Sequence, residues 1–234
     1  MQGSRVQPYR AILFDAGNTL LFLDYGRLAE GVGQALGLPL TAAALSAAAG
    51  PAAEAMEGSR AAEQERAVAF FEALFQGAGV PAERLGELRG CLSRLHGERH
   101  LWSRTAAGTD SVLARLRDAG LKLGVVSNSD GRVASALEAA GLRHYFDVVI
   151  DSALAGVEKP DPAIFRAALA ALDVSPAEAL YVGDLYEIDV LGARAAGIPA
   201  VLLLDPAGSA PDGCDTIGSL AALADDLLQE RIST

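Results

Sequence analysis

Five short apolar segments predict the strands of a sheet. The segments are Ala11–Phe14, Leu121–Val126, Val148–Ile150, Leu180–Val182 and Ala200–Leu204. Polar residues do not alternate with apolar ones inside them, which is typical of strands buried on both faces of a parallel sheet. From the second segment onward, stretches of helical length lie between them, at Gly131–Ala140, Pro162–Leu172 and Glu187–Ala196. This order predicts an α/β fold with a parallel sheet of about five strands and helices on both faces.

Local signals mark where some of these helices begin and end. Ser175-Pro176-Ala177-Glu178 has the pattern of a capping box with proline at the first helical position. Gly141 and Gly197 lie where two of the predicted helices should stop. These signals agree with the helical segments that the apolar pattern predicts.

Between the first two strands the pattern changes. Residues 24–103 contain no convincing strand, are rich in Ala, Leu, Glu and Arg, and are interrupted by Pro39, Pro51 and Pro81. Thr41 precedes an Ala-rich run and Pro81 precedes another helical stretch, so both mark helix starts. We therefore expect an inserted domain of about four helices at 24–103, and a core domain formed by 1–23 and 104–234.

Composition and charge narrow the classes of function. The chain has 234 residues, 51% of them hydrophobic, and a formal net charge of -11. This acidity argues against nucleic acids and anionic membranes as partners, but a local cation can still allow a phosphorylated substrate. Met1–Arg10 has no apolar stretch of signal-peptide length, and the apolar runs are too short to span a membrane. With only two cysteines, Cys91 and Cys214, we expect a cytoplasmic protein.

Polar residues that could take part in catalysis or ligand binding follow four of the predicted strands. In a parallel sheet, ligands bind beyond the carboxyl ends of the strands, so these residues should share one edge. Each has an ordinary alternative, such as a helix cap, a turn or a solvated loop residue. Their occurrence on successive strands favours a common site. In chain order they are Asp15, Ser127 with Asn128, Lys159, and Asp184 with Glu187 and Asp189.

Four segments around these residues resemble the four motifs of the haloacid dehalogenase superfamily, in which phosphatases dominate. They begin at Asp15-Ala16-Gly17-Asn18-Thr19, at Ser127, at Glu158-Lys159-Pro160-Asp161-Pro162 and at Tyr181-Val182-Gly183-Asp184. The match spans Arg10 to about Leu204, and the helical insertion lies where the family has its helical cap. The resemblance therefore implies a Rossmann-like core with an all-helical cap domain.

The resemblance also implies roles for these residues. Asp15 would attack phosphorus and form an aspartyl-phosphate, and Lys159 would neutralise charge on the nucleophile and the phosphate. Magnesium would be held by Asp15, Asp184 and the carbonyl of Gly17, with Asp189 orienting the surrounding ligands. The residues expected to bind the phosphoryl group of a small phosphorylated substrate are Ala16, Gly17, Thr19, Ser127, Asn128 and Lys159.

Gly17 departs from the family pattern. Phosphatases of the family usually have a second aspartate there, which protonates the leaving group and later activates water. A general acid–base of this kind contributes about 10²–10⁴-fold to the rate. The chain could therefore be an atypical phosphatase that prefers good leaving groups or borrows an acid from elsewhere. Alternatively, it could be a non-catalytic protein that binds a phosphorylated ligand.

Two other activities of the family lack that aspartate as well. A 2-haloacid dehalogenase replaces the acidic metal ligands of the fourth motif, whereas Asp184 and Asp189 are retained here. A phosphonate hydrolase needs a lysine in the cap, but the only lysines are Lys122 and Lys159, outside the insertion. The dehalogenase is thus disfavoured and the phosphonate hydrolase is excluded.

Several residues are candidates for the substitute acid or base. They are Asp24, Glu158 and a group near the end of the insertion, Arg94, His96, Arg99, His100 and Trp102. The spacing of the two histidines also fits a metal site on a helix, although a packing contact or an exposed face is the simpler interpretation. Arg27 and Arg104 could contact an anionic substrate, or could be ordinary surface residues.

Overall fold

The computed structural model describes residues 9–55, 63–204 and 210–232. The chain divides into two compact units, an α/β unit (1–22 and 104–234) and a helical unit (23–103). A two-stranded sheet lies where the chain passes between the units. It is formed by β2 (Phe22–Leu23) and β3 (Trp102–Arg104). Among the described helices, none combines the length and the apolar character needed to cross a membrane.

The α/β unit is built on a six-stranded parallel sheet with the order β5-β4-β1-β6-β7-β8. Strand β1 lies between β4 and β6, so Phe14 is level with Val125 on one side and Val182 on the other. All four residues of β1 are fully buried. The strands are β1 (Ala11–Phe14), β4 (Lys122–Ser127), β5 (Val148–Asp151), β6 (Ala179–Gly183), β7 (Ala200–Leu203) and β8 (Thr216–Ile217).

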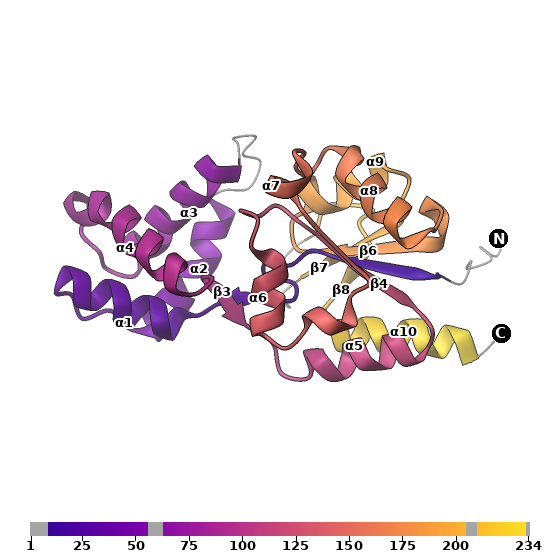
Figure 1. Ribbon diagram of the computed structural model, residues 1–234. Helices are drawn as coiled ribbons and strands as arrows, with labels where there is room; N and C mark the ends of the chain where they lie inside the picture. The colour runs from indigo at the N-terminus through magenta and orange to yellow at the C-terminus, as the bar shows by residue number, and fades with distance from the viewer. Residues whose placement is uncertain (1–8, 56–62, 205–209, 233–234) are drawn as a thin grey trace. The chain divides into compact units, whose positions relative to one another are not determined.

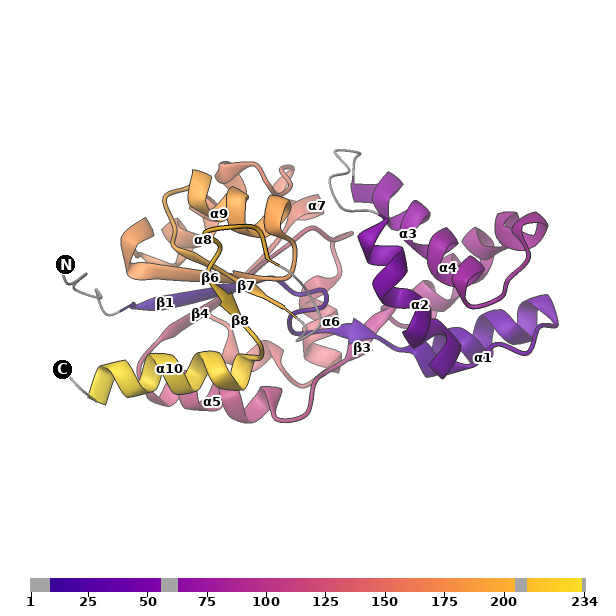
Figure 2. The same cartoon turned by 180° about the vertical axis from the view of Figure 1, so that it is seen from behind.

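Helices cover both faces of this sheet. Figures 1 and 2 show α5 and α10 on one face and α8 and α9 on the other. On the second face, Phe165 of α8 packs with Tyr181 of β6 in the main apolar core of the unit. The helices of the unit are α5 (Thr109–Asp118), α6 (Val133–Ala139), η2 (Arg143–Tyr145), α7 (Ser152–Ala155), α8 (Pro162–Leu172), η3 (Pro176–Glu178), η4 (Tyr186–Val190), α9 (Leu191–Ala195) and α10 (Leu220–Ile232).

The helical unit has its own apolar core. Leu45, Leu74 and Phe75 are fully buried at its centre. The side chains of Asp24 and Thr41 accept hydrogen bonds from backbone N–H groups in the first turns of α1 and α2 and thereby cap these helices. The helices are α1 (Tyr25–Leu36), α2 (Ala42–Glu54), α3 (Glu63–Gly77), η1 (Ala82–Arg84) and α4 (Leu85–Glu98).

The predicted α/β class is confirmed, with some differences in individual elements. Helix α8 has the predicted bounds, and the capping box at Ser175 and Glu178 is present, although it opens a short 3₁₀ helix. Gly141 and Gly197 adopt positive φ after their helices, as helix-terminating glycines do. The helix expected at 187–196 is instead a π-helix, η4, followed by the short α9. Strands β2, β3 and β8 were not predicted, because two or three residues are too few to show a periodicity.

Candidate active site

Asp15 lies directly after the central strand β1. Its backbone N–H donates to the carbonyl of Val182 at 2.8 Å, which continues the pairing of β1 with β6. Its side chain is buried. The carboxyl ends of the neighbouring strands lead to Ser127 on β4 and Asp184 after β6. The sheet order therefore places Asp15 between the two other strand ends, as expected for a site at this edge.

A tight turn follows Asp15. The carbonyl of Ala16 accepts from the N–H groups of Leu20 and Leu21, and the N–H of Asn18 donates to the carbonyl of Leu21. Asn18 has a positive φ of 51°, which asparagine tolerates better than most residues. Its side-chain amide donates to Oδ2 of Asp184 at 3.2 Å. Sequence reasoning did not include Asn18, although an asparagine next to a glycine in a turn was a usable signal.

Lys159 is buried and its ammonium contacts three oxygens. Nζ lies 2.5 Å from Oδ1 of Asp15, 2.7 Å from Oδ1 of Asp189 and 3.1 Å from the hydroxyl of Tyr181. Burial alone would lower the pKa of Lys159, but the two nearby carboxylates outweigh it and raise this pKa above its ordinary value. This shift favours the protonated, positively charged form of Lys159 next to Asp15.

The side-chain amide of Asn128 holds the main chain of Lys159. Its Nδ2 donates to the carbonyl of Lys159 at 3.0 Å, and its Oδ1 accepts from the N–H of Lys159 at 2.7 Å. Both ends of the amide are thus engaged with the protein. The structure places Asn128 as a support for the Lys159 segment, whereas the sequence suggested a contact with the phosphoryl group.

Asp189 is completely buried within the π-helix η4. Its Oδ2 accepts from the N–H of Leu185 at 3.0 Å, and its Oδ1 faces Lys159 and Tyr181. A Cβ on Gly183 would lie 2.4 Å from Cγ of Asp189, so only glycine leaves room for this carboxylate. Single π-turns of this kind often occur at functional sites, where they redirect a side chain.

Asp15, Asp184 and Asp189 form a group suited to a divalent cation. Each offers a carboxylate oxygen, and these oxygens all lie within 4.8 Å of one another. Burial raises the pKa of Asp15 from 3.8 to about 7, and burial together with the other two carboxylates raises the pKa of Asp184 well above its ordinary value. One lysine cannot balance three ionised carboxylates. Carboxylate oxygens are the ligands that Mg²⁺ prefers, so these residues fit a magnesium ion.

Two hydroxyl groups are expected to bind a phosphoryl group. Thr19 follows Asp15 closely in the chain, and Ser127 lies at the same edge of the sheet. Ser127 is buried at the end of β4. The buried Oγ1 of Thr19 has no hydrogen-bond partner among the residues that the structure describes. A buried hydroxyl without a partner is costly, so a ligand or water that pairs with Thr19 would remove this cost.

Asp151 supports the loop that follows Ser127. It was not among the residues predicted from the sequence. Its carboxylate accepts hydrogen bonds from the N–H groups of Gly131, Val133 and Ala153. The carboxylate thereby ties the start of α6 to the start of α7. Because Asp151 ends the apolar strand β5, the same strand-end rule that identified Asp15 would have found it.

The candidate substitutes for the missing acid or base have other partners or are exposed. The same is true of the two arginines, Arg27 and Arg104, that could contact an anionic substrate. In the helical unit, Asp24 caps α1 and pairs with Arg99 at 3.1 Å. Arg27 donates to the carbonyls of Arg99 and His100 near the end of α4. Arg94 pairs with Glu98 at 3.1 Å. In the rest of the chain, Glu158 and Arg104 are exposed.

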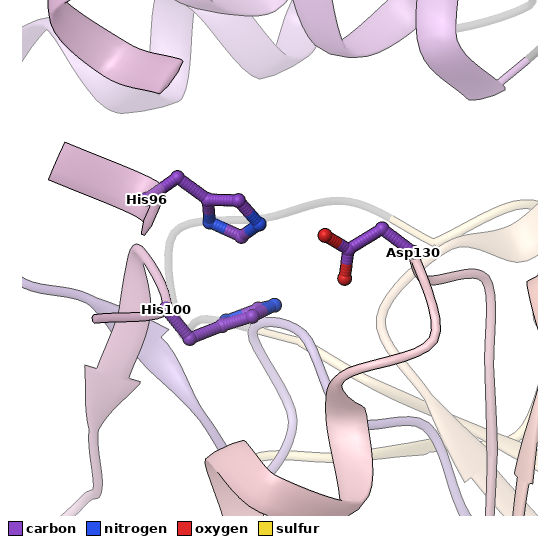
Figure 3. A group of neighbouring side chains, drawn as sticks. All are labelled: His96, His100 and Asp130. Atoms are coloured by element: carbon purple, nitrogen blue, oxygen red, sulfur yellow. The ribbon is translucent and has the colours of Figure 1, made fainter. Parts of the chain in front are cut away.

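His96 and His100 contact each other at the end of α4. Their ring centroids lie 4.7 Å apart, and Figure 3 shows the two rings. Nδ1 of His96 accepts from the N–H of Leu101, and Nδ1 of His100 lies 3.1 Å from the carbonyl of Trp102. One ring nitrogen of each histidine is thus within hydrogen-bond distance of the main chain. Asp130, also drawn in Figure 3, belongs to the α/β unit.

Comparison with known proteins identifies the class. Residues 9–197 match the haloacid dehalogenase-like hydrolase family, and the chain belongs to this family. A solved structure, the HAD phosphatase from Thermococcus onnurineus, is 27% identical, with a TM-score of 0.61 over 93% of this chain and 97% of that one.

Two curated relatives share parts of the sequence. Haloacid dehalogenase-like hydrolase domain-containing protein 3 of Bos taurus is 46% identical over 99 residues, 42% of this chain and 39% of that protein. Phosphoserine phosphatase of Thermus thermophilus is 41% identical over 133 residues, 56% of this chain and 51% of that protein. The matched segments thus span about half or less of these relatives.

Proposed function

We propose that this chain is a magnesium-dependent phosphatase that hydrolyses a small phosphorylated metabolite through a covalent intermediate on Asp15. The observation that supports this most is the group formed by Asp15, Asp184, Asp189 and Lys159 at one edge of the sheet. A nucleophilic carboxylate, a set of cation ligands and a fixed ammonium are the parts that phosphoryl transfer requires. Similarity to a phosphoserine phosphatase also supports a small phosphorylated substrate.

The proposed reaction has two steps. In the first, a carboxylate oxygen of Asp15 attacks phosphorus, the bond from phosphorus to the leaving oxygen breaks, and the leaving group departs with that electron pair. In the second, water attacks the phosphorus of the aspartyl-phosphate, loses a proton to the solvent and releases inorganic phosphate. Asp15 returns as a carboxylate. Lys159, 2.5 Å from Oδ1 of Asp15, offsets the negative charge in both steps.

The magnesium ion would be held by Asp15, Asp184 and the carbonyl of Gly17. Asp189 would orient these ligands. The bound ion supplies positive charge that screens the nucleophile from the phosphoryl oxygens. Ser127, Thr19 and the backbone amides of Ala16 and Gly17 are the proposed donors to those oxygens. We propose that the helical unit is a cap that selects the substrate.

The glycine at position 17 leads us to propose which class of leaving group the enzyme prefers. Glycine supplies no side chain to protonate the departing oxygen. Without a general acid, the rate depends strongly on how stable the leaving group is as an anion. Acyl and aryl phosphates, whose leaving groups are weak bases, should therefore be better substrates than alkyl phosphates.

The first test is phosphate release from acetyl phosphate and p-nitrophenyl phosphate, with and without Mg²⁺. Turnover should require Mg²⁺, should disappear in Asp15→Asn and should be retained in Asp118→Asn. Asp118 is an exposed aspartate at the end of α5, so its substitution controls for the chemical change itself. No turnover by the folded wild type across a broad panel of phosphates in Mg²⁺ would contradict the proposal.

A second candidate function rests on the same glycine. A protein that binds a phosphorylated ligand without hydrolysing it would keep the acidic group and Lys159 but would not need an acid at position 17. A stable beryllium fluoride or phosphate complex in Mg²⁺, without any measurable turnover, would favour this alternative. Turnover that depends on Asp15 would exclude it.

A further inference from the structure

A buried tyrosine lies behind the candidate nucleophile. Tyr181 is in the middle of β6 and is fully buried, while its neighbours in the strand are aliphatic or small. Its ring packs edge-to-face against Phe165, with centroids 5.0 Å apart. Phenylalanine would satisfy this packing equally well. The hydroxyl group therefore needs its own explanation, because burying it without hydrogen bonds is unfavourable.

The hydroxyl of Tyr181 has three polar neighbours. It lies 2.9 Å from Oδ1 of Asp189, 3.2 Å from the carbonyl of Val126 and 3.1 Å from Nζ of Lys159. Burial, with the charge of Asp189, raises the pKa of Tyr181 well above its ordinary value, so the group stays protonated. Its single proton is donated to Asp189 or Val126. Its oxygen then accepts from Lys159.

This acceptor completes the coordination of the lysine. An ammonium has three N–H donors. In Lys159 one donor is directed to Asp15, one to Asp189 and one to Tyr181. With three acceptors on different elements, the ammonium has a defined position and orientation, while Asn128 fixes the backbone of the same residue.

We propose that Tyr181 is a positioning residue that orients the ammonium of Lys159 toward Asp15. The importance of this role for turnover rests on the proposed phosphatase function. Without the hydroxyl, one N–H of the buried ammonium loses its acceptor, and the side chain can turn away from Asp15. Charge stabilisation depends on such preorganised geometry, and small misplacements of a group lower the rate substantially.

The kinetic test compares Tyr181→Phe with Tyr145→Phe. Tyr145 lies in η2 of the same unit, and its contact is with the ring of His144, so it controls for loss of a phenolic hydroxyl. In Tyr181→Phe we expect kcat to fall about 10- to 100-fold while KM changes by less than about 2-fold. Tyr145→Phe should match the wild type. An unchanged kcat in folded Tyr181→Phe, with an active wild type, would overturn the proposal.

A second measurement does not depend on activity. The chain has only two lysines, Lys122 and Lys159, so a protein labelled with ¹⁵N at lysine Nζ gives two ammonium groups to observe. We expect the NMR order parameter of the Lys159 ammonium to drop in Tyr181→Phe, and that of Lys122 to stay unchanged. An unchanged order parameter for Lys159 would overturn the positioning role. If the wild type shows no turnover but the order parameter drops, the phosphatase function fails and the positioning role stands.

Discussion

Replacing Asp15 by asparagine should change how the stability of the metal-free protein depends on pH. Burial raises the pKa of Asp15 from 3.8 to about 7 in the folded protein. As the pH rises above 3.8, the unfolded chain releases the proton of Asp15, while the folded protein retains it until about pH 7. The contribution of Asp15 to stability is therefore complete below 3.8 and is lost as the pH rises through the folded value. In Asp15→Asn the side chain does not titrate, so this dependence on pH is absent.

The size of this effect follows from the two pKa values. A difference of one pKa unit corresponds to about 1.4 kcal/mol, so the shift of Asp15 amounts to about 4 kcal/mol in total. Of this, about 3 kcal/mol is lost between about pH 5 and about pH 8. Because Asp15 is buried, solvent does not screen the effect strongly. The wild type should thus lose about 3 kcal/mol relative to Asp15→Asn across this range.

The assay is urea unfolding, followed by far-UV circular dichroism, in EDTA at several pH values. The exposed substitution Asp118→Asn should follow the wild type. Adding Mg²⁺ should stabilise the wild type more at about pH 8 than at about pH 5, because metal ligands must be ionised to bind. A constant difference between the wild type and Asp15→Asn over the whole range would refute the reasoning. Equal stabilisation by Mg²⁺ at both ends of the range would do the same.

Three further outcomes are expected. Gly183→Ala should lower activity by at least about 100-fold, because the added Cβ would displace the side chain of Asp189. The control Gly218→Ala should be neutral, because a Cβ at that position meets nothing within 4 Å. Equal activities of the two variants would contradict this prediction. Gly17→Asp should raise kcat for alkyl phosphates by up to about 100-fold if only the proton donor is missing, and an unchanged rate would point to another acid. Across a series of aryl phosphates, kcat/KM should rise steeply as the leaving group becomes more acidic, and a flat series would show that a general acid is present.

The sequence was sufficient to predict the parts of the fold that depend on local patterns. Strands β1 and β6 are buried throughout and β4 is buried from Leu123 onward, so all three are mostly apolar. Once they are taken as parallel, the topology alone brings the residues at their ends to one edge. This is why the sequence alone is enough to group Asp15, Ser127 and Asp184.

The contacts that refine this site could not be predicted, because they join residues far apart in the chain. Asn128 bonds to the main chain of Lys159, 31 residues away, and nothing near Asn128 in the sequence indicates this. Tyr181 is hidden among apolar residues of a strand, so it reads as core. The π-helix η4 was read as an ordinary helix because one extra residue per turn leaves no signal in its composition.

The most direct test of the central claim is to locate the phosphoryl group during turnover. The wild type is mixed with acetyl phosphate and Mg²⁺, quenched in acid, digested and examined by mass spectrometry. We predict a phosphoryl group on Asp15 that is absent when EDTA replaces Mg²⁺. A phosphoryl group on another residue, or turnover without any phosphorylated Asp15, would contradict the proposal that this carboxylate is the nucleophile.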